Sequence, residues 1–267
     1  MQQVLLHPGF HRTGTSSMQH FLWRNHEVLA PHVSLMMLRH MKPVIRQCGK
    51  FSLTRDPLDL LELAEMLDTA FAENPVPDGR HLIMSAEGLC GQMPGRSGVP
   101  DYSAAPMLVQ YLTGYLTEKF PQANTRVIMS TRAPDEWLES VYLYQLRMTR
   151  LTMDSDAFAD TYRAASDLDG VMEQIADLVD PIDVLFLPLS DATRHPKGPG
   201  CALLDQIAVP DTLRAALIPV GRGNEKPDDY TRQRFLDLNR SDLTDAEVAG
   251  LKTTIAEQAN LGGWKKH

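Results

Sequence analysis

The stretch that decides the fold is VLLHPGFHRTGTSS, residues 4–17, which runs into the helix-like MQHFL of residues 18–22. An apolar run followed by Gly9 and Gly14 predicts a strand, a tight turn and a helix start in close succession. Glycines let the backbone curl with its N–H groups pointing inward, and small hydroxyl residues add donors where a helix begins: Thr13, Thr15, Ser16 and Ser17. The sequence therefore predicts an anion site at this turn.

The spacing of the two glycines copies the first part of a nucleoside-triphosphate P-loop, in which a lysine follows the second glycine. Here that position is Thr15, and the cation is Arg12, two residues before Gly14. A nucleotide kinase or NTPase also needs an acidic residue closing an apolar strand to hold Mg²⁺. The apolar run 127–129 is followed by Ser-Thr-Arg and the run 81–84 by Ser-Ala-Glu. These departures disfavour the Mg²⁺-dependent kinase or NTPase, which stays an alternative.

The turn resembles the 5′-phosphosulfate-binding loop of sulfotransferases that use 3′-phosphoadenosine 5′-phosphosulfate (PAPS). That family shows Lys-Thr-Gly-Thr-Thr-Ser-Leu-Gln where this chain has RTGTSSMQ at 12–19, with arginine in place of lysine. The resemblance implies that Arg12 stabilises the bridging oxygen as the bond to sulfur breaks, acting only by charge and hydrogen bonds. It also implies a donor-binding set made of His11, Arg12, Thr13, Gly14, Thr15, Ser16 and Ser17.

A second stretch extends the resemblance. The strand expected at 126–132 ends in Arg132, and Pro134, Trp137 and Ser140 follow in the pattern Arg-x-Pro-x-x-Trp-x-x-Ser. In the sulfotransferases an arginine ending this strand and a serine eight positions later bind the 3′-phosphate of PAPS, which implies that role for Arg132 and Ser140. From the residues alone, Trp137 is expected in the core, and a strand-end ion pair for Arg132 stays open.

The acceptor's proton needs a base, and Glu87 is the first candidate. It follows the apolar run 81–85, and the carboxyl ends of parallel strands share the edge where ligands bind. Resemblance to carbohydrate sulfotransferases also favours a glutamate. His11 and His7 are the alternatives, since imidazole titrates closer to neutrality. The place of His11 inside the turn indicates that it shapes the turn.

The late segment 221–226, GRGNEK, resembles a loop that closes over the nucleotide in many bacterial sulfotransferases. The resemblance implies that Arg222 and Asn224 contribute to donor binding. Further along, Thr244 and Glu247 form a capping-box pattern that predicts a helix to about residue 260.

Apolar runs at 4–7, 81–85, 126–132 and 182–187 alternate with helical patterns, which predicts an α/β fold with a central, mainly parallel sheet flanked by helices. We expect a single domain over 1–267, and the resemblance implies a P-loop nucleotide-kinase-like, sulfotransferase architecture. Residues 33–55 lack clean periodicity and are expected to form a loop or short helix, with His40 structural. The glycine- and proline-containing segment 91–106 is expected to be a mobile loop.

Composition limits the function classes. The formal net charge of −8 disfavours non-specific nucleic-acid binding. Three cysteines far apart, Cys48, Cys90 and Cys201, suggest neither a disulfide framework nor a zinc site. No signal-like segment or bilayer-length apolar run is present, so we expect a cytoplasmic protein without a membrane span. No metal is expected. Fixed cations and helix-start N–H groups can stabilise the charge of the transferred group and of the leaving phosphate, which Mg²⁺ stabilises in kinases.

The sequence thus predicts an enzyme, a PAPS-dependent sulfotransferase. It would move a sulfuryl group from PAPS, its co-substrate, to a hydroxyl or amine of a small-molecule or carbohydrate acceptor and release adenosine 3′,5′-bisphosphate. A nucleotide-binding module without catalysis would carry the same residues and is a further alternative. The sequence specifies neither the acceptor nor the oligomeric state.

Overall fold

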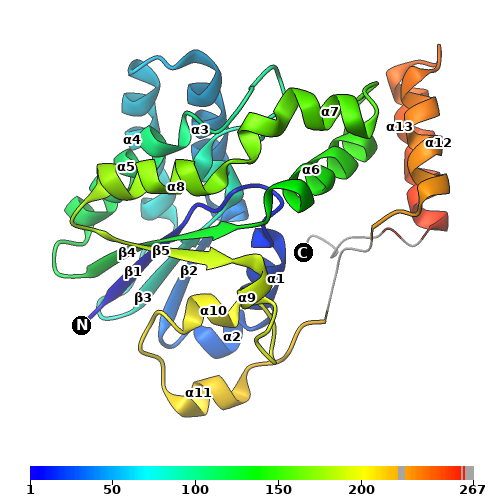
Figure 1. The fold of residues 1–267 in the computed structure, drawn as a ribbon. Helices are drawn as coiled ribbons and strands as arrows, with labels where there is room; N and C mark the ends of the chain where they lie inside the picture. Colours follow the sequence, from blue (N-terminus) through cyan, green and yellow to red (C-terminus); the bar gives the residue numbers. More distant parts are fainter. Residues whose placement is uncertain (222–225, 260, 262–267) are drawn as a thin grey trace. The chain divides into compact units, whose positions relative to one another are not determined.

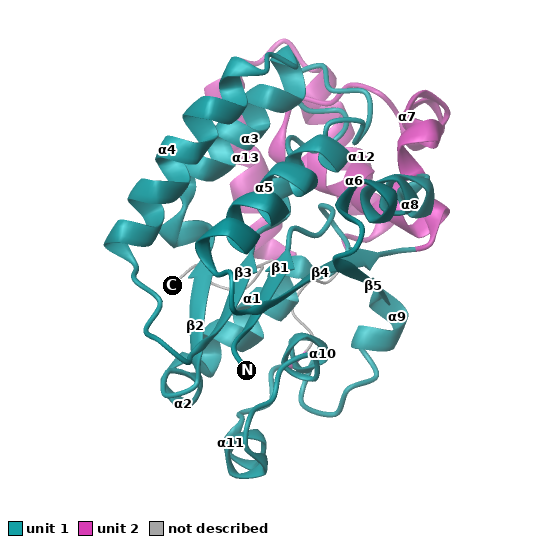
Figure 2. Ribbon diagram, turned by 90° about the vertical axis from the view of Figure 1, so that its left-hand side faces the viewer, with its two compact units in different colours: residues 1–132, 167–220 teal, residues 133–166, 221–267 magenta. Residues whose placement is uncertain are grey.

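The computed structural model describes residues 1–221, 226–259 and 261 (Figure 1). The chain divides into two compact units, residues 1–132 with 167–220 and residues 133–166 with 221–267, coloured separately in Figure 2. The expectation of a single domain across 1–267 stays a prediction.

The first unit is built on a five-stranded sheet in the order β2-β3-β1-β4-β5, with every neighbouring pair parallel (Figure 1). The strands are β1 (Gln3–His7), β2 (Val33–Met37), β3 (His81–Ser85), β4 (Asn124–Thr131) and β5 (Asp183–Pro188). Parallel strands joined by helices need both faces covered, so their sequences are nearly continuous apolar runs. The predicted α/β class with a central parallel sheet flanked by helices is confirmed.

Helices cover the two faces of this sheet in separate groups (Figure 1). One group is α1 (Thr15–Arg24), α2 (His26–Leu29), α9 (Leu189–Ala192), α10 (Cys201–Leu204) and α11 (Asp211–Ala216), and the other is α3 (Lys42–Thr54), α4 (Leu58–Glu73), α5 (Ala105–Lys119) and α8 (Leu168–Val179). Leu5, Ile83 and Ile128 of three adjacent strands form one apolar cluster with Met18 and Phe21 of α1. Within the described ranges, no helix has both the length and the apolar composition of a membrane span.

The sheet order places the end of β1 between β3 and β4, and β4 continues beyond it to Thr131. His7 is in register with Ser85 of β3, and Leu6 is in register with Val127 of β4. From β1 the chain continues to the β2 side of the sheet, whereas from β4 it continues to β5 on the other side. Ligands of open α/β sheets bind outside the carboxyl ends at such a reversal. The turns after β1 and β4 lie at this point.

Residues 33–55 correct the expectation of a loop or short helix, since they form β2, the 3₁₀ turn η1 (Leu38–His40) and α3. The structural role expected for His40 is confirmed, because its Nδ1 accepts the backbone N–H of Met37 (3.0 Å). Asn25 separates α1 from α2. Its buried amide donates to the carbonyls of Phe21 (2.9 Å) and Ile218 (3.0 Å).

The segment 91–106 was expected to be a mobile loop, but residues 91–104 are packed into the first unit and α5 begins at Ala105. Met93, Val99 and Tyr102 are each at most 2% exposed. Backbone hydrogen bonds close turns from Gly95 N to Val99 O (2.8 Å) and from Arg96 N to Met93 O (3.1 Å). The segment is therefore an ordered part of the first unit, held by buried side chains and hydrogen-bonded turns.

The second unit is helical, with α6 (Pro134–Met148), α7 (Ser155–Tyr162), the 3₁₀ turn η3 (Arg163–Ser166), α12 (Asp229–Arg240) and α13 (Asp245–Gln258). Trp137 is fully buried, as predicted. The capping box of Thr244 and Glu247 is confirmed at the start of α13. Lys252 of α13 donates to the carbonyls of Leu146 (2.7 Å) and Thr149 (2.6 Å), which satisfies the carboxyl end of α6.

Candidate functional site

The turn between β1 and α1 has an unusual backbone. Gly9, Arg12 and Gly14 have φ angles of 52°, 69° and 92°, all in the left-handed region. A Cβ atom on Gly14 would lie 2.4 Å from Leu189 Cδ1, so both its conformation and its surroundings favour glycine. Gly14 is also the N-cap residue of α1 and supplies no capping side chain. The start of α1 is therefore left open.

Four consecutive backbone N–H groups lie at this open end. The N–H groups of Thr13, Gly14, Thr15 and Ser16 have no acceptor among the described residues, whereas those of Ser17 and Met18 donate to Gly14 O (3.0 and 3.1 Å). Unpaired N–H groups at a helix start, together with the helix dipole, attract an anion. The backbone thus has the geometry of the anion site that the sequence predicts.

The threonine side chains of the turn point into the protein. Thr13 Oγ1 donates to Phe10 O (2.7 Å) and contacts Ser130 Oγ (2.7 Å), and Thr15 Oγ1 lies 3.4 Å from Phe10 O and 3.5 Å from Ser130 Oγ. Thr13 is fully buried and Thr15 is 2% exposed. The expectation that both hydroxyls add donors to the anion is thereby corrected: they brace the turn, and only their N–H groups face the site. Sequence reasoning gave no role to Ser130, although it lies near the end of a predicted strand.

Glu87 lies beside the turn, as the neighbouring positions of β1 and β3 require. It begins the 3₁₀ turn η2 (Glu87–Cys90), and Ala86 N donates to His7 O (3.3 Å). Glu87 Oε1 accepts from Ser16 Oγ (3.4 Å) and Oε2 accepts from Gln19 Nε2 (3.0 Å). One carboxylate is therefore held by two side chains of α1. Gln19 is the last residue of the motif at 12–19. Its contact with Glu87 could not be predicted from that motif, because it depends on β1 and β3 being neighbours in the sheet.

His7 lies behind the turn and is completely buried. Its Nδ1 is 2.9 Å from Ser85 Oγ, and its Nε2 has no partner among the described residues. Burial lowers the pKa of His7 to about 4, against the opposite influence of the Glu87 charge. His7 is neutral at neutral pH and enclosed.

His11 is held by a residue that the sequence did not single out, Tyr102. The Tyr102 hydroxyl accepts the backbone N–H of His11 (3.0 Å) and lies 3.0 Å from His11 Nδ1. Burial lowers the pKa of His11 to about 4, the charge of Glu87 raises it, and the charges of Arg96 and Arg12 lower it further. Burial also raises the pKa of Tyr102. These contacts hold His11 in place within the turn, and its part in donor binding stays a prediction.

Arg132 follows β4, and its Nη1 donates to the carbonyl of Arg12 (3.4 Å). The structure thus brings the strand-end arginine to the turn. Ser140 is buried in α6 of the second unit, so its pairing with Arg132 on one phosphate stays a prediction. Arg222 and Asn224 lie outside the described residues. In the described part of the chain, no three His, Cys, Asp or Glu residues gather as metal ligands.

No family model matches this chain. No curated protein matches it in sequence. Among solved structures, a sulfotransferase from Alicyclobacillus acidocaldarius is similar over 95% of this chain and 96% of that chain, with 14% sequence identity and a TM-score of 0.43. The functional argument therefore rests on the geometry of the first unit.

Proposed function

We propose that this chain is a sulfotransferase that moves a sulfuryl group from PAPS to a hydroxyl or amine acceptor and releases adenosine 3′,5′-bisphosphate. The observation that carries the proposal is the run of four unpaired N–H groups, Thr13 to Ser16, at the start of α1. The carboxylate of Glu87 lies beside this run, and the guanidinium of Arg132 reaches the carbonyl of Arg12. An anion cradle next to a fixed carboxylate suits group transfer from a phosphate-bound donor.

The donor would be held at two places. The N–H groups of the turn, with Arg12 and the outward-facing Ser16 and Ser17, would bind the 5′-phosphosulfate. Arg132 and Ser140 would bind the 3′-phosphate, with Arg222 and Asn224 from the late segment. When bound, PAPS supplies a sulfuryl group joined to a phosphate leaving group.

Glu87 would act as the base. It accepts the proton of the acceptor hydroxyl or amine, while Arg12 and the turn N–H groups stabilise the negative charge that builds on the leaving phosphate. Ser16 and Gln19 fix both carboxylate oxygens, so the base is oriented before the acceptor arrives. His7 is less suited because it is enclosed, and His11 because its Nδ1 faces the Tyr102 hydroxyl.

The acceptor is proposed to be a small molecule or a carbohydrate. The reason is the glutamate base, which the resemblance to carbohydrate sulfotransferases favours. The compartment is proposed to be the cytoplasm, because all three cysteines are free and buried.

A Mg²⁺-dependent kinase or NTPase keeps one observation in its favour. Ser16 stands where a P-loop carries its Mg²⁺-binding serine or threonine, and its hydroxyl lies 3.4 Å from the Glu87 carboxylate. Oxygen ligands of this kind are those that Mg²⁺ prefers. The lysine of that loop is nevertheless replaced by Thr15.

Thermal unfolding distinguishes the sulfotransferase from the kinase or NTPase. The midpoint is measured with adenosine 3′,5′-bisphosphate, with ATP plus Mg²⁺, and without a ligand. A ligand at about a hundred times its dissociation constant stabilises by roughly 2.7 kcal/mol, which raises the midpoint by several degrees for a chain of this size. We expect the shift with the bisphosphate, followed by sulfuryl transfer from PAPS in an acceptor screen. A shift with ATP and Mg²⁺ alone would favour the kinase, and bisphosphate binding without transfer to any acceptor would favour the non-catalytic module.

A further inference from the structure

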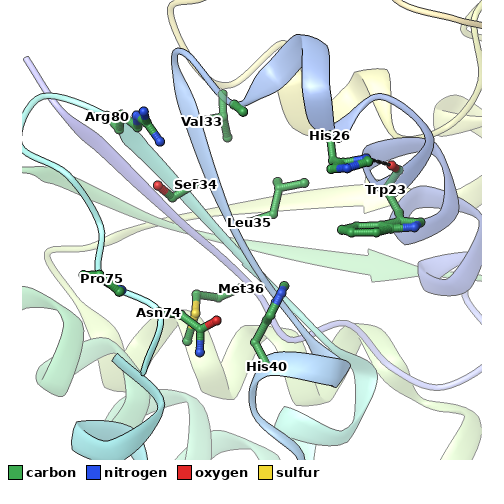
Figure 3. Close-up of a pocket in the computed structure, with 11 residues that line it drawn as sticks. Trp23, His26, Val33, Ser34, Leu35, Met36, His40, Asn74, Pro75 and Arg80 are labelled. Atoms are coloured by element: carbon green, nitrogen blue, oxygen red, sulfur yellow. Dashed lines mark hydrogen bonds between the residues drawn. The ribbon is translucent and has the colours of Figure 1, made fainter. Parts of the chain in front are cut away.

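A groove lies along the open side of β2, the edge strand of the first unit (Figure 3). Its volume is about 280 Å³. In Figure 3 the residues of β2 run through the middle, with Arg80, Pro75 and Asn74 on one side and Trp23 and His26 on the other. His40 lies at the carboxyl end of the strand. The turn and Glu87 contribute no lining residue.

The floor of the groove presents unpaired backbone groups. Alternate residues of a strand direct their N–H and C=O groups to opposite sides. His81 N donates to His32 O (2.9 Å), so the even-numbered residues of β2 face β3. The N–H of Met37 points away from β3 and is already taken by His40. The N–H and C=O of Leu35 point the same way and have no partner among the described residues.

One wall of the groove is rigid and aromatic. The ring of Trp23 stacks on His26, with centroids 4.1 Å apart and planes 11° from parallel. On Trp23 also lies the Arg39 guanidinium, 3.2 Å from the ring centroid. His26 Nδ1 donates to Trp23 O (2.8 Å), which fixes the stack at the end of α1. His26 and Arg39 cover the two faces of the Trp23 ring, so the ring is held rigid and leaves only its edge for a ligand.

The lining of the groove includes a guanidinium and no carboxylate. The guanidinium belongs to Arg80, in a chain whose net charge is −8. The guanidinium of Arg80 and the hydroxyl of Ser34 have no hydrogen-bond or ion-pair partner in the described part of the chain. Figure 3 shows Arg80 directed toward Ser34 and the start of β2. An anionic group on the ligand would give the guanidinium of Arg80 an ion-pair partner.

We propose that the groove binds an extended, acidic segment of another protein, which adds to β2 as a further strand. Its backbone pairs with the N–H and C=O of Leu35, and one of its carboxylates pairs with Arg80. A second copy that paired its own β2 with this strand would bring another Arg80 to the groove and no lining carboxylate, so charge complementarity favours a different, acidic partner. The site is separate from the turn and does not depend on sulfuryl transfer.

The test is fluorescence anisotropy with the full chain and three labelled, end-blocked probes. The first is Val-Glu-Val-Glu-Val, the second is its Val-Gln-Val-Gln-Val counterpart, and the third is the acidic peptide with its backbone nitrogens methylated along one edge. We expect the acidic peptide to bind, the glutamine peptide to bind about tenfold more weakly, as for a charged hydrogen bond, and the methylated peptide not to bind.

Arg80→Gln should remove the preference for the acidic probe, whereas Arg24→Gln, an exposed arginine of α1 outside the lining, should leave it unchanged. Equal binding of the acidic and glutamine probes would overturn the ionic part of the proposal. If glutarate displaces the acidic probe and the methylated probe binds as well, the groove takes a carboxylate and not a strand. A dimer in sedimentation that dissociates on adding the acidic peptide would assign the groove to a second copy.

Discussion

The turn after β1 and the open side of β2 both present unpaired backbone N–H groups, but the structure holds them differently. At the turn, the N–H groups are fixed by left-handed residues and by the buried contacts of Thr13, Thr15 and Ser130. At β2, the groups around Leu35 lie on a plain strand, and the nearby side chain of Arg80 has no described partner. The turn is preorganised for one compact anion, whereas the groove gains its interactions only with a ligand. Substitutions at the turn should therefore have the larger effects.

The largest effect is expected for Glu87→Gln, which keeps the shape of the side chain and removes the base. The turnover number for sulfuryl transfer should fall by roughly 10²–10⁴, the usual contribution of general-base catalysis, while affinity for the bisphosphate changes little. Steady-state kinetics with PAPS provide the measurement. Glu118→Gln, an exposed carboxylate of α5, is the control and should leave turnover unchanged. Near-normal turnover of Glu87→Gln would remove this residue from the role.

The next effect is expected for Gly14→Ala, because Gly14 has a φ of 92° and its added Cβ would meet Leu189. We expect a loss of about 1–3 kcal/mol in the free energy of unfolding, the cost of a strained backbone residue, and weaker binding of the bisphosphate. Urea unfolding and calorimetric titration measure the two quantities.

Gly114→Ala provides the matched control for that substitution. Gly114 lies in the interior of α5, is exposed, and has open space where a Cβ would be added. Alanine should there stabilise the helix by about 1 kcal/mol. If both variants behave alike, the conformation of the turn is not what makes glycine necessary at position 14.

A pH effect of intermediate size should arise at the turn. The pKa of His7 is lowered to about 4 in the folded chain, below the value of about 6.5 for an unfolded histidine. The unfolded state therefore binds more protons, so the stabilising contribution is complete above pH 6.5 and is lost as the pH falls toward 4. At pH 5 the loss amounts to about 2 kcal/mol.

Urea unfolding between pH 7 and 5 measures this loss. In His7→Gln, whose amide can still reach Ser85, the dependence on pH should be flatter, leaving the contributions of His11 and of the carboxylates. An unchanged slope in the variant would mean that His7 does not carry the effect.

The smallest effect on stability is expected for Arg80→Gln. Its guanidinium has no described partner, and the hydrogen bond of its backbone carbonyl with Gln2 Nε2 does not involve the side chain. The free energy of unfolding should change by less than about 0.5 kcal/mol, although the preference for the acidic peptide over the glutamine peptide is lost. A large destabilisation would show that the Arg80 side chain contributes to packing in the free chain. The groove would then be preorganised, as the turn is.

The same contrast explains what the sequence could predict. The turn was predictable because its backbone needs particular residues: an apolar run, two glycines and small hydroxyl residues. The run 81–85 has the apolar character of a strand buried on both faces. Predicting this strand therefore put Glu87 at the carboxyl edge of the sheet, where the structure has it. Here local chemistry and tertiary position agree.

The parts that could not be predicted depend on contacts distant in the chain. The strand β2 was missed because Val33–Met37 lies at the edge of the sheet, where neither a continuous apolar run nor an alternating one is required. Ser130 and Tyr102 contact the turn from 117 and 91 residues away. Their roles arise from the sheet order and from the packing of residues 91–104, and no local pattern marks them.

The hydrogen bond between Thr13 and Ser130 has a mechanical consequence. Ser130 stands two residues before Arg132 on the same strand end, and Arg132 in turn reaches the carbonyl of Arg12. The turn after β1 and the end of β4 are thus fastened at two points and should move as one body. Any ligand group that shifts one of them also shifts the other, so two phosphates bound there would not contribute independent binding energies. Occupation of either position would alter the affinity at the other.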